Sequence, residues 1–399
     1  MASEWKRLPL ASALRFRRPD VPVDASETYD FAGVYSYGRG VFRSQSRSGS
    51  EFSYRLVTRL GRGELVYLKV GAWEGAFGIV PEECEGCVVS PEFPVFEINS
   101  ELVLPRFLEL LVGVPKVWES LSGGSTGTNA RRRRLHPNDL LKCSVLVPSL
   151  KEQRAILAHV EAIEQAVREA KELRAHIEGE LEALLMSAYQ RITEGAPRRP
   201  LGEVAPLTRR PVVVDQTASY PQIAVRSFGR GTFNKPPLEG NDVTWEKPFL
   251  VEGGDLLISN IKAWEGAIAV VANEDHGRFA SHRYLTCVAN PSLATTRYIC
   301  FHLLTPEGLL HVGQASPGSA DRNRTLGAKA LEAIPVPVPP VEKQRWFDRV
   351  YAEVDRARRL QKQSADEEGQ LVPSIVQRLF APAITSSVAD VGGVLASQR

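Results

Sequence analysis

Apolar residues recur with two different spacings along this chain. In residues 1–150 and 197–340 they form short runs between glycines and prolines, as in Leu65–Leu68 and Leu256–Ile258. Short apolar runs bounded by turn residues predict β-strands. Short helices are expected as well, for example around Pro105–Leu111 and Thr296–Leu304. Residues 1–150 and 197–340 are therefore expected to form two globular α+β domains of mixed topology.

A helical pattern follows the first globular part. No proline interrupts residues 151–192, and apolar residues recur there at alternating spacings of four and three, with Arg174 as the exception. The apolar positions are Ile156, Val160, Ile163, Val167, Ala170, Ile177, Leu181, Leu184 and Ala188. This spacing is typical of a coiled-coil seam, roughly 60 Å long at ~1.5 Å per residue. Ser149 is the expected N-cap, with Glu152 at the capping-box position.

A second, less regular helix is predicted over Val341–Phe380. Coiled-coil spacing holds at Phe347, Val350, Val354 and Ala357, then weakens at Gln361 and Ser364 before Leu371 and Ile375. Gly369 and Pro373 predict a kink or break near the end of this helix. Two long helices at equivalent places are expected to pack antiparallel on each other and to act as a rigid spacer between the globular parts.

The chain is an internal duplication with an offset of 191 residues. Tyr37–Phe42 matches Phe228–Phe233, and Ala72–Ala76 is identical to Ala263–Ala267. Other equivalent pairs are Asp24/Asp215, Tyr29/Tyr220, Asn99/Asn290, Arg131/Arg322, Arg133/Arg324 and Gln153/Gln344. A period of this length is far too long for a solenoid repeat and indicates two tandem domain-sized units. We therefore expect a pseudo-twofold molecule.

Each globular part runs into its helix through the same kind of segment. The segments are Val147–Arg154 and Val338–Arg345, which join a proline-rich strand to a charged helix start that ends in Gln-Arg. With the duplication, this arrangement resembles the specificity (S, HsdS) subunits of Type I restriction–modification enzymes. The resemblance extends to about residue 385. It rests on the arrangement and its repetition, because no single motif is diagnostic.

The resemblance implies an organisation and a set of partners. The implied parts are target-recognition domain 1 (1–150), coiled-coil helix 1 (151–196), target-recognition domain 2 (197–340), coiled-coil helix 2 (341–385) and a C-terminal tail (386–399). Such a chain would bind double-stranded DNA at a bipartite site and dock two methyltransferase (modification) subunits on its helices. Restriction (translocase and nuclease) subunits would join the full complex. Adenine methylation and cleavage would be performed by these partners, so the chain itself is expected to be non-catalytic.

Composition and charge narrow the class of protein without deciding it. The chain is 43% hydrophobic and 24% charged with a net charge of +2, which favours folded domains over disorder. A DNA-binding protein needs only a local basic surface, so near-neutrality does not exclude one. There is no apolar run of about 18 residues and no secretory h-region near the N-terminus. With five scattered cysteines, a cytoplasmic protein without a membrane span is expected.

The sequence offers no catalytic, cofactor or metal motif. It lacks the Asn/Asp-Pro-Pro-aromatic motif of amino-group methylation and the glycine-rich phosphate loop of ATPases. Cys84 and Cys87 form a CxxC pair, but the equivalent positions in the second half are Asp275 and Arg278. A structural zinc site usually needs four ligands. We therefore expect no catalytic residues, no cofactor and no metal.

Basic residues at matching places are the candidates for DNA contact. The run Arg131–Arg134 and its counterpart around Arg322 and Arg324 both follow stretches rich in glycine and serine. Arg39 and Arg230 lie between glycines, in turns that allow a close approach to a groove. The candidate residues are Arg39, Lys69, Arg131, Arg132, Arg133, Arg134, Arg230, Lys262, His282, Arg283, Arg322 and Arg324. His282 and Arg283 replace residues of the first half and would help the halves read different bases.

Two alternatives remain open. The same architecture could serve another restriction or phage-defence methyltransferase system, which the neighbouring genes would identify. An enzyme with duplicated domains, such as a nuclease or a glycan-acting protein, would need paired carboxylates in both halves, yet only Glu74 and Glu265 recur in a motif. The adjacent Trp73 and Trp264 are interpreted as mainly structural, because buried tryptophan usually serves packing. Replacing Trp264 is then expected to unfold its domain.

Overall fold

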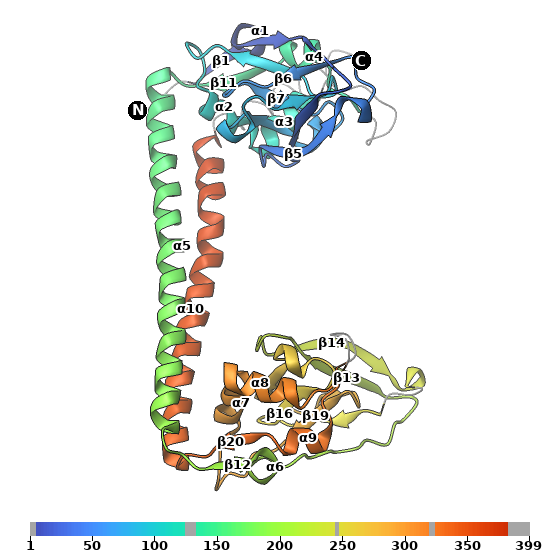
Figure 1. The fold of residues 1–399 in the computed structure, drawn as a ribbon. Coiled ribbons are helices and arrows are strands. Elements are labelled where there is room, and N and C mark those ends of the chain that lie inside the picture. The colour runs from blue at the N-terminus through green and yellow to red at the C-terminus, as the bar shows by residue number, and fades with distance from the viewer. Residues whose placement is uncertain (1–4, 124–132, 244–246, 319–323, 382–399) are drawn as a thin grey trace. The chain divides into compact units, whose positions relative to one another are not determined.

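The protein divides into two compact units, each built from both halves of the chain. The computed structural model describes residues 5–123, 133–243, 247–318 and 324–381. Unit 1 contains residues 1–173 and 363–399, and unit 2 contains residues 174–362. Both unit boundaries cut through the two long helices, α5 (Leu150–Thr193) and α10 (Val341–Leu379) (Figure 1). Each unit therefore holds one globular part, the start of one long helix and the end of the other.

Unit 1 is an α+β fold with helices packed against small, mostly antiparallel sheets; β4 and β9 pair in parallel. Its sheets, in pairing order, are β1 (Lys6–Pro9)–β11 (Ser144–Val147), β2 (Leu14–Arg17)–β10 (Val95–Ile98)–β7 (Leu65–Tyr67)–β8 (Phe77–Ile79), and β3 (Val21–Pro22)–β6 (Leu56–Arg59)–β9 (Val88–Val89)–β4 (Thr28–Val34)–β5 (Val41–Ser48). Its short helices are α1 (Leu10–Ala13), α2 (Pro105–Val112), α3 (Pro115–Ser122) and α4 (Pro137–Lys142). The apolar faces of α2 and α3 close the core over β7, β8 and β10.

Unit 2 repeats this plan. Its sheets are β12 (Arg198–Pro200)–β20 (Pro335–Pro337), β17 (Ile268–Val270)–β16 (Leu256–Ser259)–β19 (Tyr284–Cys287), and β14 (Thr232–Glu239)–β13 (Ser219–Val225)–β18 (Phe279–Ala280)–β15 (Phe249–Leu250). Its short helices are α6 (Leu201–Val204), α7 (Thr296–Leu304), α8 (Pro306–Gln314) and α9 (Ala328–Glu332). The hairpins β4–β5 and β13–β14 each carry a register shift, between Asp30 and Ala32 and between Tyr220 and Gln222, which are within one residue of equivalent places.

In each unit the segments of α5 and α10 pack antiparallel (Figure 1). In unit 2, the Arg358 guanidinium donates to both carboxylate oxygens of Glu178, while Tyr189 lies 6.3 Å from Phe347 between ring centroids. In unit 1, Leu157 shares a core with Val376 and Phe380. Residue numbers fall on one helix as they rise on the other, which is the antiparallel pairing that the apolar spacing predicts.

A buried glutamine fixes the start of each long helix. The Gln153 amide donates to the carbonyl oxygens of Leu102 (3.1 Å) and Pro148 (3.0 Å), and its oxygen accepts from the N–H of Leu104 (2.9 Å). Gln344 makes the same three bonds one repeat later. Both side chains are fully buried. The repeated glutamine therefore joins each helix to the globular part before it.

The fold class predicted from the sequence is confirmed: helices and strands mix in each unit, and a long helix follows each globular part. The capping box is also confirmed, because the Ser149 N–H donates to Glu152 at 3.1 Å and the Glu152 N–H donates to the Ser149 hydroxyl at 3.4 Å. The predicted break near Gly369 and Pro373 is wrong, since α10 continues through both to Leu379. Packing of Val376, Leu379 and Phe380 on the unit 1 core holds the last turns in place.

Candidate nucleic-acid interface

Each unit presents one turn docked on another, and we call this element the paired turns. In unit 1, the turn after β4 lies on the 3-10 turn Ala72–Glu74. The N–H groups of Tyr37 and Gly38 donate to the carbonyls of Glu74 (2.7 Å) and Gly75 (2.9 Å). In unit 2, Phe228 and Gly229 donate in the same way to Glu265 and Gly266, at the same two distances. The two most similar motifs of the duplication therefore form a single element.

The tip of the paired turns carries an aromatic ring and an arginine. Tyr37 and Phe228 have backbone φ angles of 63° and 62°, the left-handed region. Their side chains are 64% and 71% exposed. Holding a residue other than glycine there costs roughly 1–2 kcal/mol. Arg39 and Arg230 follow two residues later and are exposed. Sequence reasoning selected both arginines but missed the two aromatic residues, although an aromatic residue precedes Gly-Arg-Gly in both halves.

The backbone of the Ala-Trp-Glu-Gly segment is structural, as expected, but the Trp264 ring is not a core residue. The ring is half-buried, and its Nε1 donates to the Ile261 carbonyl at 3.2 Å. Two candidate cations lie over it: Lys262 Nζ is 5.4 Å and Arg324 Cζ is 5.2 Å from the ring centroid. This corrects the expectation of a buried tryptophan, and it brings Lys262 and Arg324 together on one aromatic surface.

Lys262 is also held by an acid. Its ammonium is 2.6 Å from Glu265 Oε1, and this hydrogen bond lowers the pKa of Glu265 below its ordinary value. The Glu265 carboxylate also accepts from the Ser227 hydroxyl at 2.9 Å, while Glu74 accepts from Ser36 at 3.3 Å in unit 1. Glu74 and Glu265 therefore stabilise the paired turns by hydrogen bonding, a structural role that does not require a catalytic carboxylate.

Lys69 lies in a second element that both units share, a backbone frame made by two main-chain hydrogen bonds. In unit 1, the Lys69 N–H donates to Glu92 and the Lys69 carbonyl accepts from Leu135. In unit 2, Asn260 bonds in the same way to Arg283 and Leu326. Lys69 thus corresponds to Asn260, and Glu92 to Arg283. The frame is the same in the two units, but the side chains that it presents differ.

The other basic residues predicted to contact DNA differ in their exposure and in their hydrogen-bond partners. Arg131, Arg132 and Arg322 lie outside the described residues. Arg133 is exposed, and Arg134 is exposed with its guanidinium 3.2 Å from Glu92 Oε1. The Lys69 ammonium donates to the Pro91 carbonyl at 2.7 Å. His282 is half-buried, and Arg283 beside it is exposed.

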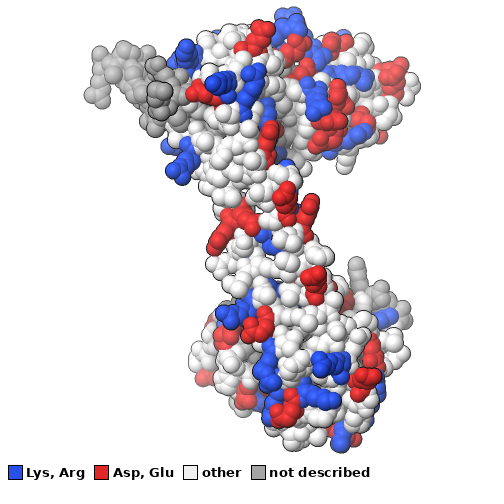
Figure 2. All heavy atoms as spheres, turned by 90° about the vertical axis from the view of Figure 1, so that its left-hand side faces the viewer, with Lys and Arg blue, Asp and Glu red and all other residues white. Residues whose placement is uncertain are grey.

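Charge on the visible surface is mixed in sign. On the face that Figure 2 shows, Lys and Arg side chains are interspersed with Asp and Glu on both globular parts. This distribution agrees with the net charge of +2. On this face, basic residues therefore occur among acidic ones rather than as one continuous patch.

Metal ligands and thiols form no further site in the described part of the chain. No group of three or more His, Cys, Asp or Glu side chains is placed there to hold a metal ion. Cys84 and Cys87 are buried free thiols, and burial raises the pKa of each. None of the helices in the described ranges is long and apolar enough to cross a membrane.

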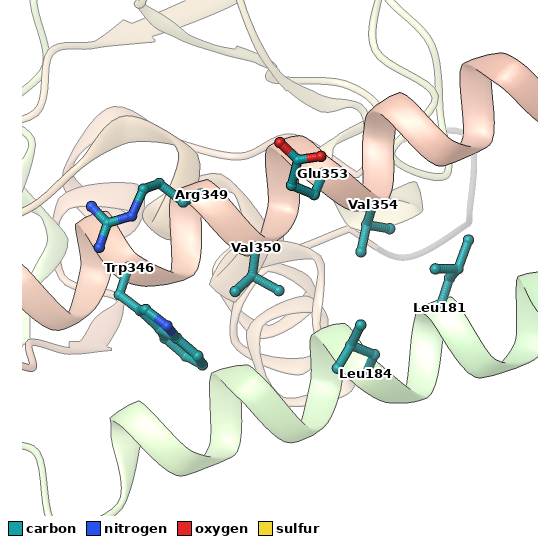
Figure 3. A pocket seen from close by; sticks show the side chains of 7 residues that line it. All are labelled: Leu181, Leu184, Trp346, Arg349, Val350, Glu353 and Val354. Atoms are coloured by element: carbon teal, nitrogen blue, oxygen red, sulfur yellow. The ribbon is translucent and has the colours of Figure 1, made fainter.

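The helix pair of unit 2 has an apolar pocket of about 410 Å³ (Figure 3). Leu181 and Leu184 line it from α5, and Trp346, Val350 and Val354 from α10, with Arg349 and Glu353 at its polar side. Leu184 is half exposed. The unit 1 position equivalent to Trp346 is Ala155, so this indole belongs to unit 2 alone.

Solved structures share this fold, although no protein-family model and no curated protein matches the sequence. The HsdS subunit from Thermoanaerobacter tengcongensis is 21% identical, with a TM-score of 0.55 over 94% of this chain and 96% of its own. A chain from a study of complex assembly and conformational transition in the type I R-M system is 19% identical. Its TM-score is 0.62 over 95% of this chain and 98% of its own. In its fold, this chain therefore resembles the HsdS subunits of type I restriction–modification systems, as its sequence predicts.

Proposed function

We propose that the chain is the DNA-recognition subunit of a Type I restriction–modification complex. In this role each globular part binds one half of a bipartite site in double-stranded DNA. The chain supplies binding and positioning, while adenine methylation and cleavage are carried out by its methyltransferase and restriction partners. The shared fold supports the class of protein.

The observation that carries this proposal is the repetition of the paired turns. Both units present an exposed aromatic residue and an exposed arginine on a turn held by two main-chain hydrogen bonds. Arginine is suited to phosphate and guanine contacts, and rings stack on bases. Lys69 and Glu92 in one unit against Asn260 and Arg283 in the other would let equivalent frames read different base sequences.

The long helices are proposed to dock the methyltransferase subunits. The pocket lined by Leu184, Trp346 and Val350 supports this, because exposed apolar surface on a helix pair is suited to bind a partner helix. Replacing Trp346 with alanine should then reduce co-purification of the methyltransferase more than tenfold. Gln363→Ala, at an exposed position of the same helix, is the matched control and should leave co-purification of the methyltransferase unchanged.

Methylome sequencing tests the DNA-recognition role directly. Cells that carry this gene with its neighbouring methyltransferase gene should gain methyladenine at a two-part motif with a spacer of fixed length. Deleting only this gene should abolish that methylation while the methyltransferase is still made. An unchanged methylome with an active methyltransferase partner would refute the proposal.

A further inference from the structure

Tyr37 and Phe228 combine exposure with an unfavourable backbone conformation. They are the only residues other than glycine with positive φ in the described part of the chain. An exposed ring gains little from packing, and glycine would adopt this conformation without strain. Even so, an aromatic residue stands at this position in both repeats. Strain retained at an exposed position points to a contact that the ring makes with something else.

The backbone around both rings is held in place before any partner binds. Two main-chain hydrogen bonds fix each tip to the second turn of the pair. Gly38 also packs closely on Gly113 at the end of α2, where a Cβ atom would lie 2.8 Å from the Gly113 Cα. A ring on such a support enters a binding site with little loss of conformational freedom.

In each unit, the arginine of the turn lies near an aromatic ring. Arg39 Cζ lies 5.1 Å from the centroid of the Tyr35 ring, which itself stacks on Phe42. Arg230 Cζ lies 5.6 Å from the Phe228 ring. An aromatic tip flanked by arginines suits a ligand with both negative charge and flat apolar faces, and DNA has both.

We propose that Tyr37 and Phe228 are wedge residues, each of which inserts its ring against a base step of the half-site bound by its own unit. Arg39 and Arg230 would contact the phosphates beside that step. Apolar side chains that enter a base step unstack it and kink the duplex. The inference rests on the proposed function and adds to it a local distortion of each half-site.

Glycine substitution separates this role from a structural one. Tyr37→Gly and Phe228→Gly remove the ring and relieve the backbone strain, so the melting temperature should stay the same or rise. Affinity should fall about 10- to 100-fold for each variant, as for loss of a base-stacking residue. Phe228→Trp should keep most of the affinity. Tyr54→Ala and Val213→Ala are the controls, because both residues are exposed outside the paired turns, and they should bind like the wild type.

The assay uses the full chain in complex with its methyltransferase. The probe is an unmethylated, fluorescein-labelled duplex that carries the two-part motif identified by methylome sequencing. Binding is measured by fluorescence anisotropy. A second duplex places 2-aminopurine in each half-site in turn, and its fluorescence should rise on binding wild type. Tyr37→Gly should remove the rise in one half-site and Phe228→Gly in the other.

The outcomes distinguish the two proposals. Wild-type complex that binds no duplex refutes the proposed function and this inference with it. Wild-type binding matched by both glycine variants, with the same 2-aminopurine response, overturns the wedge alone. A lower melting temperature of the glycine variants would also overturn it, because the ring would then serve packing.

Discussion

At the scale of single residues, buried polar side chains connect elements that are distant in the sequence. Gln153 and Gln344 each bond to three backbone groups. Their repetition is visible in the sequence, but their role is not. Two of the three groups lie 49 and 51 residues earlier, on a loop that only the folded chain brings near, and the third lies five residues earlier. Sequence reasoning therefore selected the arginine turns, whose chemistry is local, and missed these long-range contacts.

Replacing Gln344 with leucine should destabilise unit 2 by roughly 2–4 kcal/mol. The change keeps the volume but leaves the Thr295 N–H and two carbonyl oxygens buried without partners. Chemical denaturation monitored for each unit would measure the loss. Gln153→Leu should weaken unit 1 instead, and Gln363→Leu, at an exposed position, should be close to neutral. Equal effects on both units would contradict this assignment.

His302 should make the stability of unit 2 depend on pH. Burial lowers the pKa of His302 to about 4, and its Nδ1 lies 2.7 Å from the Tyr189 hydroxyl. The unfolded chain takes up a proton near the ordinary histidine pKa of about 6.5, whereas the folded unit does not until about pH 4. The contribution of His302 to stability is thus constant above about pH 7 and falls by roughly 3 kcal/mol as the pH drops from 6.5 to 4.

Thermal denaturation across this pH range would measure the effect. In His302→Gln, which cannot titrate, the slope for unit 2 between pH 6.5 and 4 should become smaller than in the wild type. His176, an exposed histidine of α5 in the same unit, offers a control, because His176→Gln should leave the slope unchanged. A slope equal in wild type and His302→Gln would rule out this histidine as its source.

At the scale of elements, the apolar pattern predicted most of the fold. The predicted runs at Leu65 and Leu256 are β7 and β16, and the two predicted short helices are α2 and α7. The bounds of α10 were predicted to within one residue, but the break near Gly369 and Pro373 is wrong, because packing of the last turns on unit 1 outweighs the local preferences of glycine and proline. The docking of one turn on another could not be predicted, since it joins segments more than thirty residues apart, mainly through backbone hydrogen bonds that carry no sequence signal.

Gly369, in the interior of α10, should lower the stability of unit 1, and alanine should restore it. Gly369 lies within the helix, and a Cβ atom there would meet nothing within 4 Å. Gly369→Ala should therefore stabilise unit 1 by about 1 kcal/mol, since alanine loses less backbone freedom in a helix. Gly179→Ala, equally unobstructed in α5, should do the same for unit 2. A drop in the melting temperature of either variant would show that the helix needs glycine there.

At the scale of the whole molecule, each unit is completed by the helix that belongs to the other repeat. Phe380, after the last turn of α10, is fully buried in unit 1, 5.1 Å from the Phe107 ring and 5.7 Å from the Trp5 ring between centroids. In unit 2, Tyr189 near the end of α5 lies 5.9 Å from Tyr298. These aromatic contacts are equivalent under the duplication, so the two repeats are interlocked.

Phe380→Ala should destabilise the N-terminal globular part although the substitution lies more than 250 residues later in the sequence. Loss of a fully buried phenylalanine costs about 3–5 kcal/mol. Hydrogen exchange of the full chain should show lower protection over residues 105–112 and unchanged protection over residues 296–304. Tyr189→Ala should give the reverse pattern. Loss of protection in both regions from either change would mean that the units do not unfold separately.

Interlocked repeats also constrain how the protein emerges from the ribosome. Residues 105–112 leave the exit tunnel with the face that contacts Phe380 uncovered, and translation at ~5–20 residues per second leaves it so for roughly 10–50 seconds. All residues of unit 2 are synthesised before α10 is complete. The C-terminal globular part can thus finish folding first, while the part made first waits for the last helix and would be the one exposed to chaperones during synthesis.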